Sequence, residues 1–402
     1  MSSEVSLSAA TRQNLLSMQD TAALTGTTQN RLATGKKVSS ALDNPVNFFT
    51  AQGLTNRSSD LGSLLDGISN GIQTIQAANQ GLTSIQKLVD SAKSTANQAL
   101  ATQLATAGTA KNVLSVSSST NVSVDFYVNG TATTVNVSSG ESIDTVISNL
   151  NTVVSALGGG NAFAKDTAGT RIVLNATAAI EFKDSTDQAA LGFSTTSTVT
   201  SNKYGSSNDV TATGTDLTIT GVAERKKLSD QYNSLLTQID QLARDSNYNG
   251  VNLLSSNSPT NKLHIAFNEK DTSNIDVQAV DATSIGLNLT AITGNSGATA
   301  DGKGSFLLDN DVKSTLTRLT NASSELRSDA STFGSKLSIV QNRQDFTKHI
   351  INVLGDGASK LTDADLNEEA ANSQALGVRQ QLGISALSLA SQAQQAILQL
   401  LR

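Results

Sequence analysis

Residues that could hold a metal ion are few in this chain. There are two histidines, His264 and His349, and no cysteine. A zinc site takes three or four ligands, mostly from Cys, His, Asp and Glu side chains. Neither histidine has another histidine nearby in the sequence, and Ile265 follows His264, so the HExxH pattern of a zinc protease is absent. The sequence therefore predicts no metal site.

Other groups with chemical potential also have simpler explanations. The run Gly158–Gly160 lacks the Lys-Ser/Thr pair that completes a phosphate-binding loop, so we interpret it as a turn. Carboxylates cluster at Asp363, Asp365, Glu368 and Glu369, where a helix is expected to begin. A helix N-terminus stabilises negative charge, which accounts for this cluster. We expect no enzymatic activity and no cofactor.

The composition favours thin helical packing over a large globular core. Of 402 residues, 3% are aromatic and 15% are charged, against a usual charged fraction of about 25%. Trp is absent and Pro occurs twice. The net charge of −6 gives no basic surface for nucleic acid, and no apolar run of about 18 residues could span a membrane. We therefore expect neither nucleic acid nor membrane as a partner.

Apolar residues recur at every seventh position in two long segments. The first series contains Leu54, Leu61, Ile68, Ile75, Leu82, Val89 and Ala96. The second contains Val312, Leu319, Leu326, Phe333, Val340 and Leu354, with Thr347 as a polar break. Such a repeat predicts long helices packed as a coiled coil. We assign the core of this predicted rod to Leu61, Ile68, Ile75, Leu82, Leu319, Leu326, Phe333 and Val340.

Both ends of the chain are predicted helices with few charges. Residues 1–30 carry only Glu4, Arg12 and Asp20 as charges, and residues 380–401 carry none. An isolated helix pair has no globular core to pack against, so we expect these helices to pack against other copies of the chain. The predicted assembly residues are Leu15, Leu16, Met18, Leu24, Leu389, Ile397, Leu398 and Leu401.

Between these helices the apolar period changes from 3.6 to 2. Strands are predicted at 113–116, 122–128, 133–137, 171–174 and 180–182, with a helix at 142–157. The Ser/Thr-rich residues 194–215 are predicted as a loop or a weak edge strand. We interpret residues 105–225 as a small inserted α+β domain.

Helical spacing returns after the insertion, followed by a turn at 246–250 and a predicted β-hairpin. The apolar residues of this hairpin are Leu263, Ile265, Phe267, Ile275 and Val277. A Gly-rich loop is expected at 293–304, and a connector is expected at 355–364, before the last helix.

Ordered motifs at both ends resemble bacterial flagellin. The segments RLATGKKV at 31–38 and ALDNP at 41–45 resemble the connector after the first helix of that family. The segment NGVNLL at 249–254 resembles the turn before its hairpin, and 398–402 resembles its terminus. The likeness covers roughly residues 1–104 and 226–402, and NPVNFF at 44–49 is similar to alphaproteobacterial members.

The resemblance implies a mainly α fold. Long N- and C-terminal coiled-coil helices would form a rod with a β-hairpin, and an α+β outer domain would be inserted. Residues 1–45 and 359–402 would form the inner layer, called D0. Residues 46–104 and 226–358 would form the rod, D1, and 105–225 the variable outer domain.

The resemblance also implies a structural subunit that polymerises into the extracellular flagellar filament for swimming. Its expected partners are copies of itself, the flagellar type III export apparatus, a flagellin chaperone, and the filament-cap and hook-junction proteins. Residues 1–13 lack the basic and apolar regions of a cleaved signal peptide, so we expect export without one. A hook–filament junction protein, or a subunit whose outer domain acts in adhesion, are the alternatives.

Overall fold

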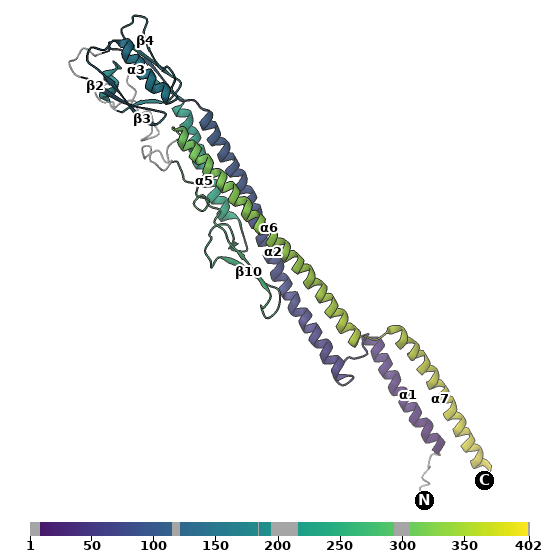
Figure 1. Cartoon of the computed structure of the whole chain (residues 1–402). Coiled ribbons are helices and arrows are strands. Elements are labelled where there is room, and N and C mark those ends of the chain that lie inside the picture. The colour runs from purple at the N-terminus through teal and green to yellow at the C-terminus, as the bar shows by residue number, and fades with distance from the viewer. Residues whose placement is uncertain (1–8, 115–120, 184, 194–215, 293–305, 401–402) are drawn as a thin grey trace. The chain divides into compact units, whose positions relative to one another are not determined.

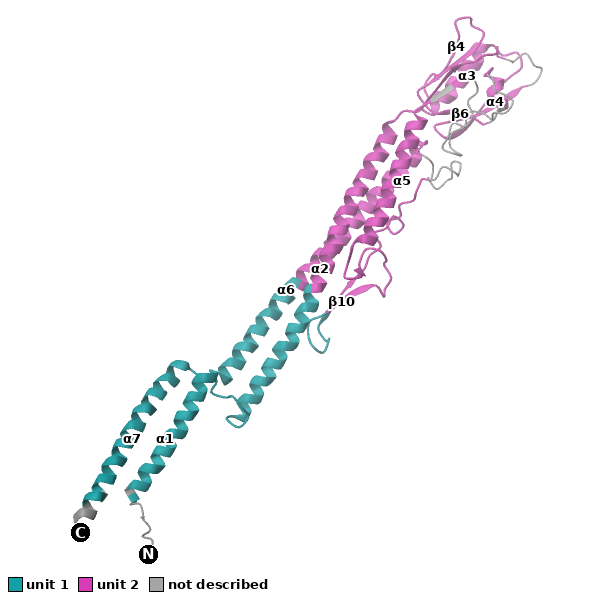
Figure 2. Ribbon diagram, turned by 180° about the vertical axis from the view of Figure 1, so that it is seen from behind, with its two compact units in different colours: residues 1–69, 266–274, 341–402 teal, residues 70–265, 275–340 magenta. Residues whose placement is uncertain are grey.

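The computed structural model describes residues 9–114, 121–183, 185–193, 216–292 and 306–400. The predicted loops at 194–215 and 293–304, residues 115–116 of the first predicted strand, and Leu401 lie outside these ranges. The chain divides into two compact units (Figure 2). Unit 1 contains residues 1–69, 266–274 and 341–402, and unit 2 contains residues 70–265 and 275–340.

Four helical segments dominate unit 1. Helices α1 (Ala9–Thr34) and α7 (Leu366–Leu400) lie side by side (Figure 1). The first part of α2 (Pro45–Ala101) and the last part of α6 (Asp309–Thr362) complete the unit. Helix α2 begins at Pro45 because Asn44 caps it: the Asn47 N–H donates to Asn44 Oδ1 over 3.1 Å. Proline suits the first helical position, where no N–H is needed.

The connector after α1 binds the junction of α6 and α7. Gly35 ends α1 with a φ of 70°, and its N–H donates to the Arg31 carbonyl over 2.8 Å. The Lys37 and Val38 N–H groups donate to the Thr362 carbonyl at 2.7 and 3.1 Å. The Ala364 N–H in turn donates to the Gly35 carbonyl over 2.9 Å. Backbone hydrogen bonds therefore join the segment that follows α1 to the segment between α6 and α7.

The connector predicted at 355–364 is wrong over most of its length. Helix α6 continues to Thr362, and α7 begins at Leu366. Gly357 lies against Leu54 of α2, and the next residue, Ala358, is buried. A glycine costs a helix about 1 kcal/mol relative to alanine. Packing against α2 outweighs this local cost.

In unit 2, α2 and α6 are joined by α5 (Val222–Asp245), and the three helices lie side by side (Figure 1). Helix α5 buries Leu228, Tyr232, Leu236 and Ile239 at helical spacing. The Gln86 side chain donates to Ser323 Oγ over 2.8 Å, which links α2 to α6. Helix α5 begins at Val222, so its first four residues lie inside the predicted bounds of the insertion, 105–225.

Two short hairpins follow α5. Strands β8 (Asn247–Tyr248) and β9 (Val251–Asn252) flank Asn249 and Gly250, both at positive φ, so the predicted turn is a two-residue hairpin loop. Strands β10 (Lys262–Ala266) and β11 (Asn274–Gln278) form the predicted larger hairpin. It packs on α2 at Gly71, where a Cβ atom would overlap the Ile265 side chain.

The described residues of the inserted region form two antiparallel sheets and two helices. Its elements are β1 (Ala105–Thr109), β2 (Val122–Val128), β3 (Thr131–Val137), α3 (Ile143–Ala156), β4 (Phe163–Lys165), β5 (Ile172–Ala176), β6 (Ile180–Phe182), α4 (Ser185–Ala190) and β7 (Leu217–Thr220). The sheet orders are β4-β5-β1-β7 and β3-β2-β6. Phe126, Leu150 and Phe182 lie in its core. The mainly α fold with long terminal helices and an inserted α+β region is confirmed.

The prediction that the first strand of the insertion lies at 113–116 is wrong. Val113 and Leu114 are not in a strand, whereas Ala105–Thr109 forms β1 between β5 and β7. This strand consists of small residues because its neighbours approach closely: a Cβ atom at Gly108 would overlap the Asp216 carbonyl. No alternation of large apolar residues therefore marks it.

Within the described ranges, no helix is long and apolar enough to cross a membrane.

Candidate assembly interface

Helix α1 presents threonines, not leucines, to α7. Thr11, Thr21 and Thr28 are its buried residues, spaced as one helical stripe. The Thr21 hydroxyl donates to the Ser17 carbonyl over 2.7 Å, and Thr25 repeats this bond to Thr21. Because the Thr21 and Thr25 hydroxyls are bonded within α1, their methyl groups remain for packing against the neighbouring helix.

The facing stripe of α7 is equally sparse in large apolar residues. Glu369 and Leu376 are buried, and Gly383 lies against Met18, whose Cγ is 3.1 Å from the position of a Cβ at Gly383. Across the same seam, Arg31 donates to Glu369 over 2.9 Å. Met18, predicted to contact other copies, is therefore partly used within the chain.

Most of the large apolar side chains of this helix pair point outward. Of the predicted assembly residues, Leu15, Leu16, Leu24 and Leu389 are exposed, by 43%, 62%, 51% and 70%. Further exposed residues on α7 are Leu366, Val378, Leu382 and Ile384. The side chains of Ile397 and Leu398, and all of Leu401, lie outside the described part of the chain. The pair is thus apolar on its outside and mostly small or polar at its seam, the reverse of an ordinary soluble helix pair.

A groove of about 570 Å³ runs along one face of the α1–α7 pair. Its apolar lining includes Leu24, Leu376 and Leu382, and two arginines, Arg31 and Arg379, also line it. An apolar groove of this kind, flanked by polar groups, is typical of surfaces that bind other proteins.

The predicted rod-core and hairpin residues lie inward. Buried rod-core residues are Leu61, Ile68, Ile75, Leu82, Leu319, Leu326, Phe333 and Val340. In the hairpin, Ile265, Phe267 and Val277 are buried, while Leu263 and Ile275 are half-buried. Arg343 of α6 lies over the Phe267 ring, with 5.6 Å from Cζ to the ring centroid.

Two of the groups with chemical potential, Asp365 and His264, make contacts within the fold. Asp365 Oδ1 accepts the backbone N–H groups of Asn367 and Glu368 at 2.9 and 3.3 Å, so the carboxylate cluster begins with a helix cap. His264 Nδ1 lies 2.6 Å from Asp276 Oδ1 on the hairpin. Among the described residues, no group of three or more His, Asp or Glu side chains is arranged to hold a metal ion.

One sequence pattern was overlooked. Residues 67–71 read GISNG, which matches the GxSxG spacing of a hydrolase nucleophile. That motif requires a sharp turn between a strand and a helix, whereas Ser69 lies in the middle of α2. Its hydroxyl donates to the Leu65 carbonyl over 2.9 Å and accepts from Gln344 over 2.8 Å. The serine therefore joins α2 to α6.

Sequence reasoning also missed Arg225 and the threonine stripe of α1. Arg225 stands in the run Glu224–Lys227, which has the character of an exposed charged face, yet it is buried. The spacing of Thr11, Thr21 and Thr28 could have indicated a shared helix face, because separations of ten and seven residues both place side chains on the same side of a helix.

Comparison with known proteins identifies both helical regions. The family model described as bacterial flagellin N-terminal helical region matches residues 5–119, and the bacterial flagellin C-terminal helical region matches residues 316–401. Flagellin FljJ of Caulobacter vibrioides is 31% identical over 194 residues, which cover 48% of this chain and 65% of that protein. Flagellin of Brucella melitensis is 26% identical over 44% of this chain and 63% of its own length.

A third relative, flagellin C of Rhizobium meliloti, is 38% identical over 77 residues, covering 19% of this chain and 24% of that protein. The chain thus spans less than two thirds of the length of each of these relatives. The two matched regions nevertheless occur in order at the two ends of the sequence and together cover 201 of its 402 residues, which is half of the chain. The chain belongs to the bacterial flagellin family.

Proposed function

We propose that this protein is a structural subunit that polymerises into the extracellular filament of the bacterial flagellum, with which cells swim. The observation that carries the proposal is the reversed apolar distribution of α1 and α7. Leu16 and Leu389 are more than half exposed in the single chain. Removing apolar surface from water contributes roughly 25 cal/mol per Å². Burial against neighbouring copies supplies the stabilisation that the threonine seam lacks.

In this proposal the domains keep their predicted roles. Residues 1–45 and 359–402 form the inner layer, residues 46–104 and 226–358 the surrounding rod, and 105–225 the outer domain. Support comes from the position of the exposed leucines, which lie on α1 and α7, and from the self-contained core of the insertion. The protein has no enzymatic role, and its partner in the filament is a second copy of the chain.

The proposal includes transient partners on the way to the filament. The chain leaves the cell through the flagellar type III apparatus without a cleaved signal peptide. A chaperone covers it before export, and the cap and hook-junction proteins contact it outside the cell. The absence of cysteine is compatible with passage of an unfolded chain, because no disulfide has to be broken.

Two matched substitutions test the proposal. Leu24→Asp places a charge on the outer face of α1, and Val113→Asp places one on an exposed apolar residue of the insertion, which is 60% exposed. An unpaired charge in a buried contact is strongly unfavourable. Leu24→Asp should prevent sedimentable filaments that are visible by electron microscopy, and Val113→Asp should not. Equal polymerisation of both variants at the wild-type critical concentration would refute the proposed contact.

A further inference from the structure

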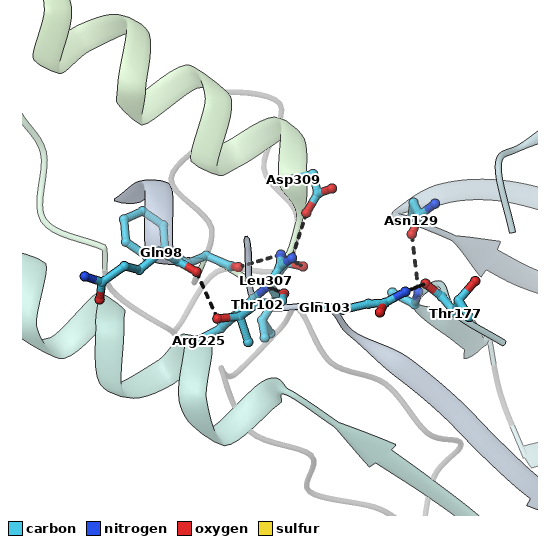
Figure 3. Close-up of polar contacts among 10 residues, drawn as sticks. Gln98, Thr102, Gln103, Asn129, Thr177, Arg225, Leu307 and Asp309 are labelled. Atoms are coloured by element: carbon cyan, nitrogen blue, oxygen red, sulfur yellow. Dashed lines mark hydrogen bonds and ion pairs between the residues drawn. The ribbon is translucent and has the colours of Figure 1, made fainter. Parts of the chain in front are cut away.

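Arg225 is the most buried charged side chain in the described part of the chain, with 3% exposure. It lies in the first turn of α5, and its guanidinium is directed toward the ends of α2 and α6 (Figure 3). Nε donates to the Thr102 carbonyl over 2.8 Å. One terminal nitrogen donates to the Phe306 and Leu307 carbonyls, both at 3.1 Å, and the other to Asp309 Oδ1 at 2.9 Å.

These acceptors belong to two different helix ends. Thr102 directly follows α2, whose last carbonyl groups have no partner within the helix. Residues 306–309 lead into α6, which begins at Asp309. A positive charge at the C-terminus of α2 is favoured by the helix dipole. The planar guanidinium spreads five donors over three nitrogen atoms in a fixed geometry, whereas the three donors of lysine all lie on one nitrogen atom and cannot reach the same acceptors together. One side chain of α5 therefore joins all three helices.

The insertion connects two of these helices, α2 and α5, independently of Arg225. Strands β1 and β7 pair through Ala105 and Thr220, so the exit from α2 lies beside the entry to α5. Gly221, at a φ of 87°, permits this approach, because a Cβ there would overlap the Gln103 carbonyl. This strand pairing does not include α6. Arg225 is the group that also connects α6 to this junction through directional hydrogen bonds.

Apolar packing at this junction is small. Leu104, Val222 and Leu307 form a buried cluster with Ala179 of the insertion. Leu308 also contacts the turn of the insertion at Gly130, where a Cβ would overlap its side chain. Such non-directional contacts do not define how far one helix is displaced along another. The directional hydrogen bonds of Arg225 do.

The displacement of one helix along another has to be fixed by specific contacts, because the apolar pattern of each helix repeats every seven residues. A seven-residue slide replaces Leu82 by Ile75 on α2, or Leu319 by Leu326 on α6, with little change in apolar character. Buried polar groups fix register in coiled coils for this reason. We propose that Arg225 is the positioning residue that sets the register of the α2, α5 and α6 ends at the insertion junction. This concerns the single chain in solution and is independent of polymerisation.

The chain has no cysteine, so the proposal can be tested by paired spin labels in the full-length protein. The outer pair is Ser94→Cys with Lys313→Cys, exposed positions near the junction. The inner pair is Thr83→Cys with Ser328→Cys, also exposed, near the bond between Gln86 and Ser323. Each pair is measured in wild type, Arg225→Met and Arg225→Lys. Arg244→Met, at an exposed arginine of the same helix, is the control.

We expect Arg225→Met and Arg225→Lys to spread the outer-pair distances toward longer values, by up to about 10 Å, the rise of seven helical residues. Because α2 and α6 are continuous helices, the inner pair should shift in the same way, whereas both pairs should keep the wild-type distribution in Arg244→Met. Arg225→Lys retains charge and stem, so it remains informative if Arg225→Met does not fold. The proposal is overturned if the outer pair is unchanged in the lysine variant. It is equally overturned if the lysine variant loses helical content by circular dichroism as its distances broaden, since that is general destabilisation.

Discussion

Arg31 of α1 donates to Glu369 of α7 over 2.9 Å, although 338 residues separate them in the sequence. The two side chains differ in environment: the Glu369 side chain is 8% exposed and that of Arg31 is 41% exposed. The other carboxylate oxygen, Oε2, has no hydrogen-bond partner among the described groups. The seam between the terminal helices thus contains a buried carboxylate that depends on one arginine.

Arg31→Met should destabilise the α1–α7 pair more than Glu369→Gln does. Loss of one partner of a buried pair costs about 3–5 kcal/mol, and the exposure of Arg31 reduces this to about 1–3 kcal/mol. The double variant removes both charges and should recover part of the loss. Thermal melting of assembled protein, followed by circular dichroism, measures the difference. A double variant no more stable than Arg31→Met would contradict this role of Glu369.

The hairpin should lose stability in acid through Asp276. Hydrogen bonds from Lys262, at 2.5 Å, and then His264 hold the pKa of the Asp276 carboxyl below its usual 3.8. A carboxyl with a lowered pKa in the folded state contributes stability above pH 3.8, and this is lost as pH falls through the lowered value. The protection factors of the β10 and β11 amides, which are corrected for the slower intrinsic exchange in acid, should therefore fall in that window. In Asp276→Asn the same fall should be absent.

Two glycines of α2 should respond oppositely to alanine. A Cβ at Gly71 meets Ile265, whereas nothing in the chain lies within 4 Å of a Cβ at Gly67. Gly67→Ala should stabilise the monomer by up to about 1 kcal/mol through helix propensity. Gly71→Ala should destabilise it by about 1–3 kcal/mol through overpacking. Monomer denaturation curves decide this, and equal shifts for the two variants would show that the contact with Ile265 has no energetic consequence.

The insertion should be removable at the boundary that the strand pairing defines. Ala105 lies opposite Thr220, so a short Gly-Ser linker can replace residues 105–220, and closure entropy changes slowly with loop length. This deletion should fold and polymerise. Removal of 105–225, the boundary predicted from the sequence, also removes Arg225 and the first turn of α5, and should reduce helix protection and polymer yield. If the shorter deletion folds but forms no filament, the outward position of the insertion is wrong.

The heptad seams were predictable because burial there follows a local pattern. Ile68, Ile75 and Phe333 lie at seven-residue spacing and are buried. The larger hairpin and α3 were also predicted, since apolar alternation and a Ser142 cap mark them in the sequence.

The features that were missed depend on contacts between distant residues. Strand β1 lacks large side chains because Asp216 approaches Gly108. Helix α6 continues through Gly355 and Gly357 because α2 lies beside it. The burial of Arg225 depends on carbonyl groups about 80 and 120 residues away. A local pattern cannot indicate such partners.

Amide exchange on monomer and polymer tests the central claim most directly. The threonine seam of α1 and α7 offers little apolar burial, and ordering a residue costs about 1–2 kcal/mol in backbone entropy. Residues 9–30 and 370–395 should therefore exchange rapidly in the monomer and become strongly protected in the filament, while α3 of the insertion exchanges equally in both. Protection of residues 9–30 that is already complete in the monomer, or unchanged on polymerisation, would contradict assembly through the outer faces of α1 and α7.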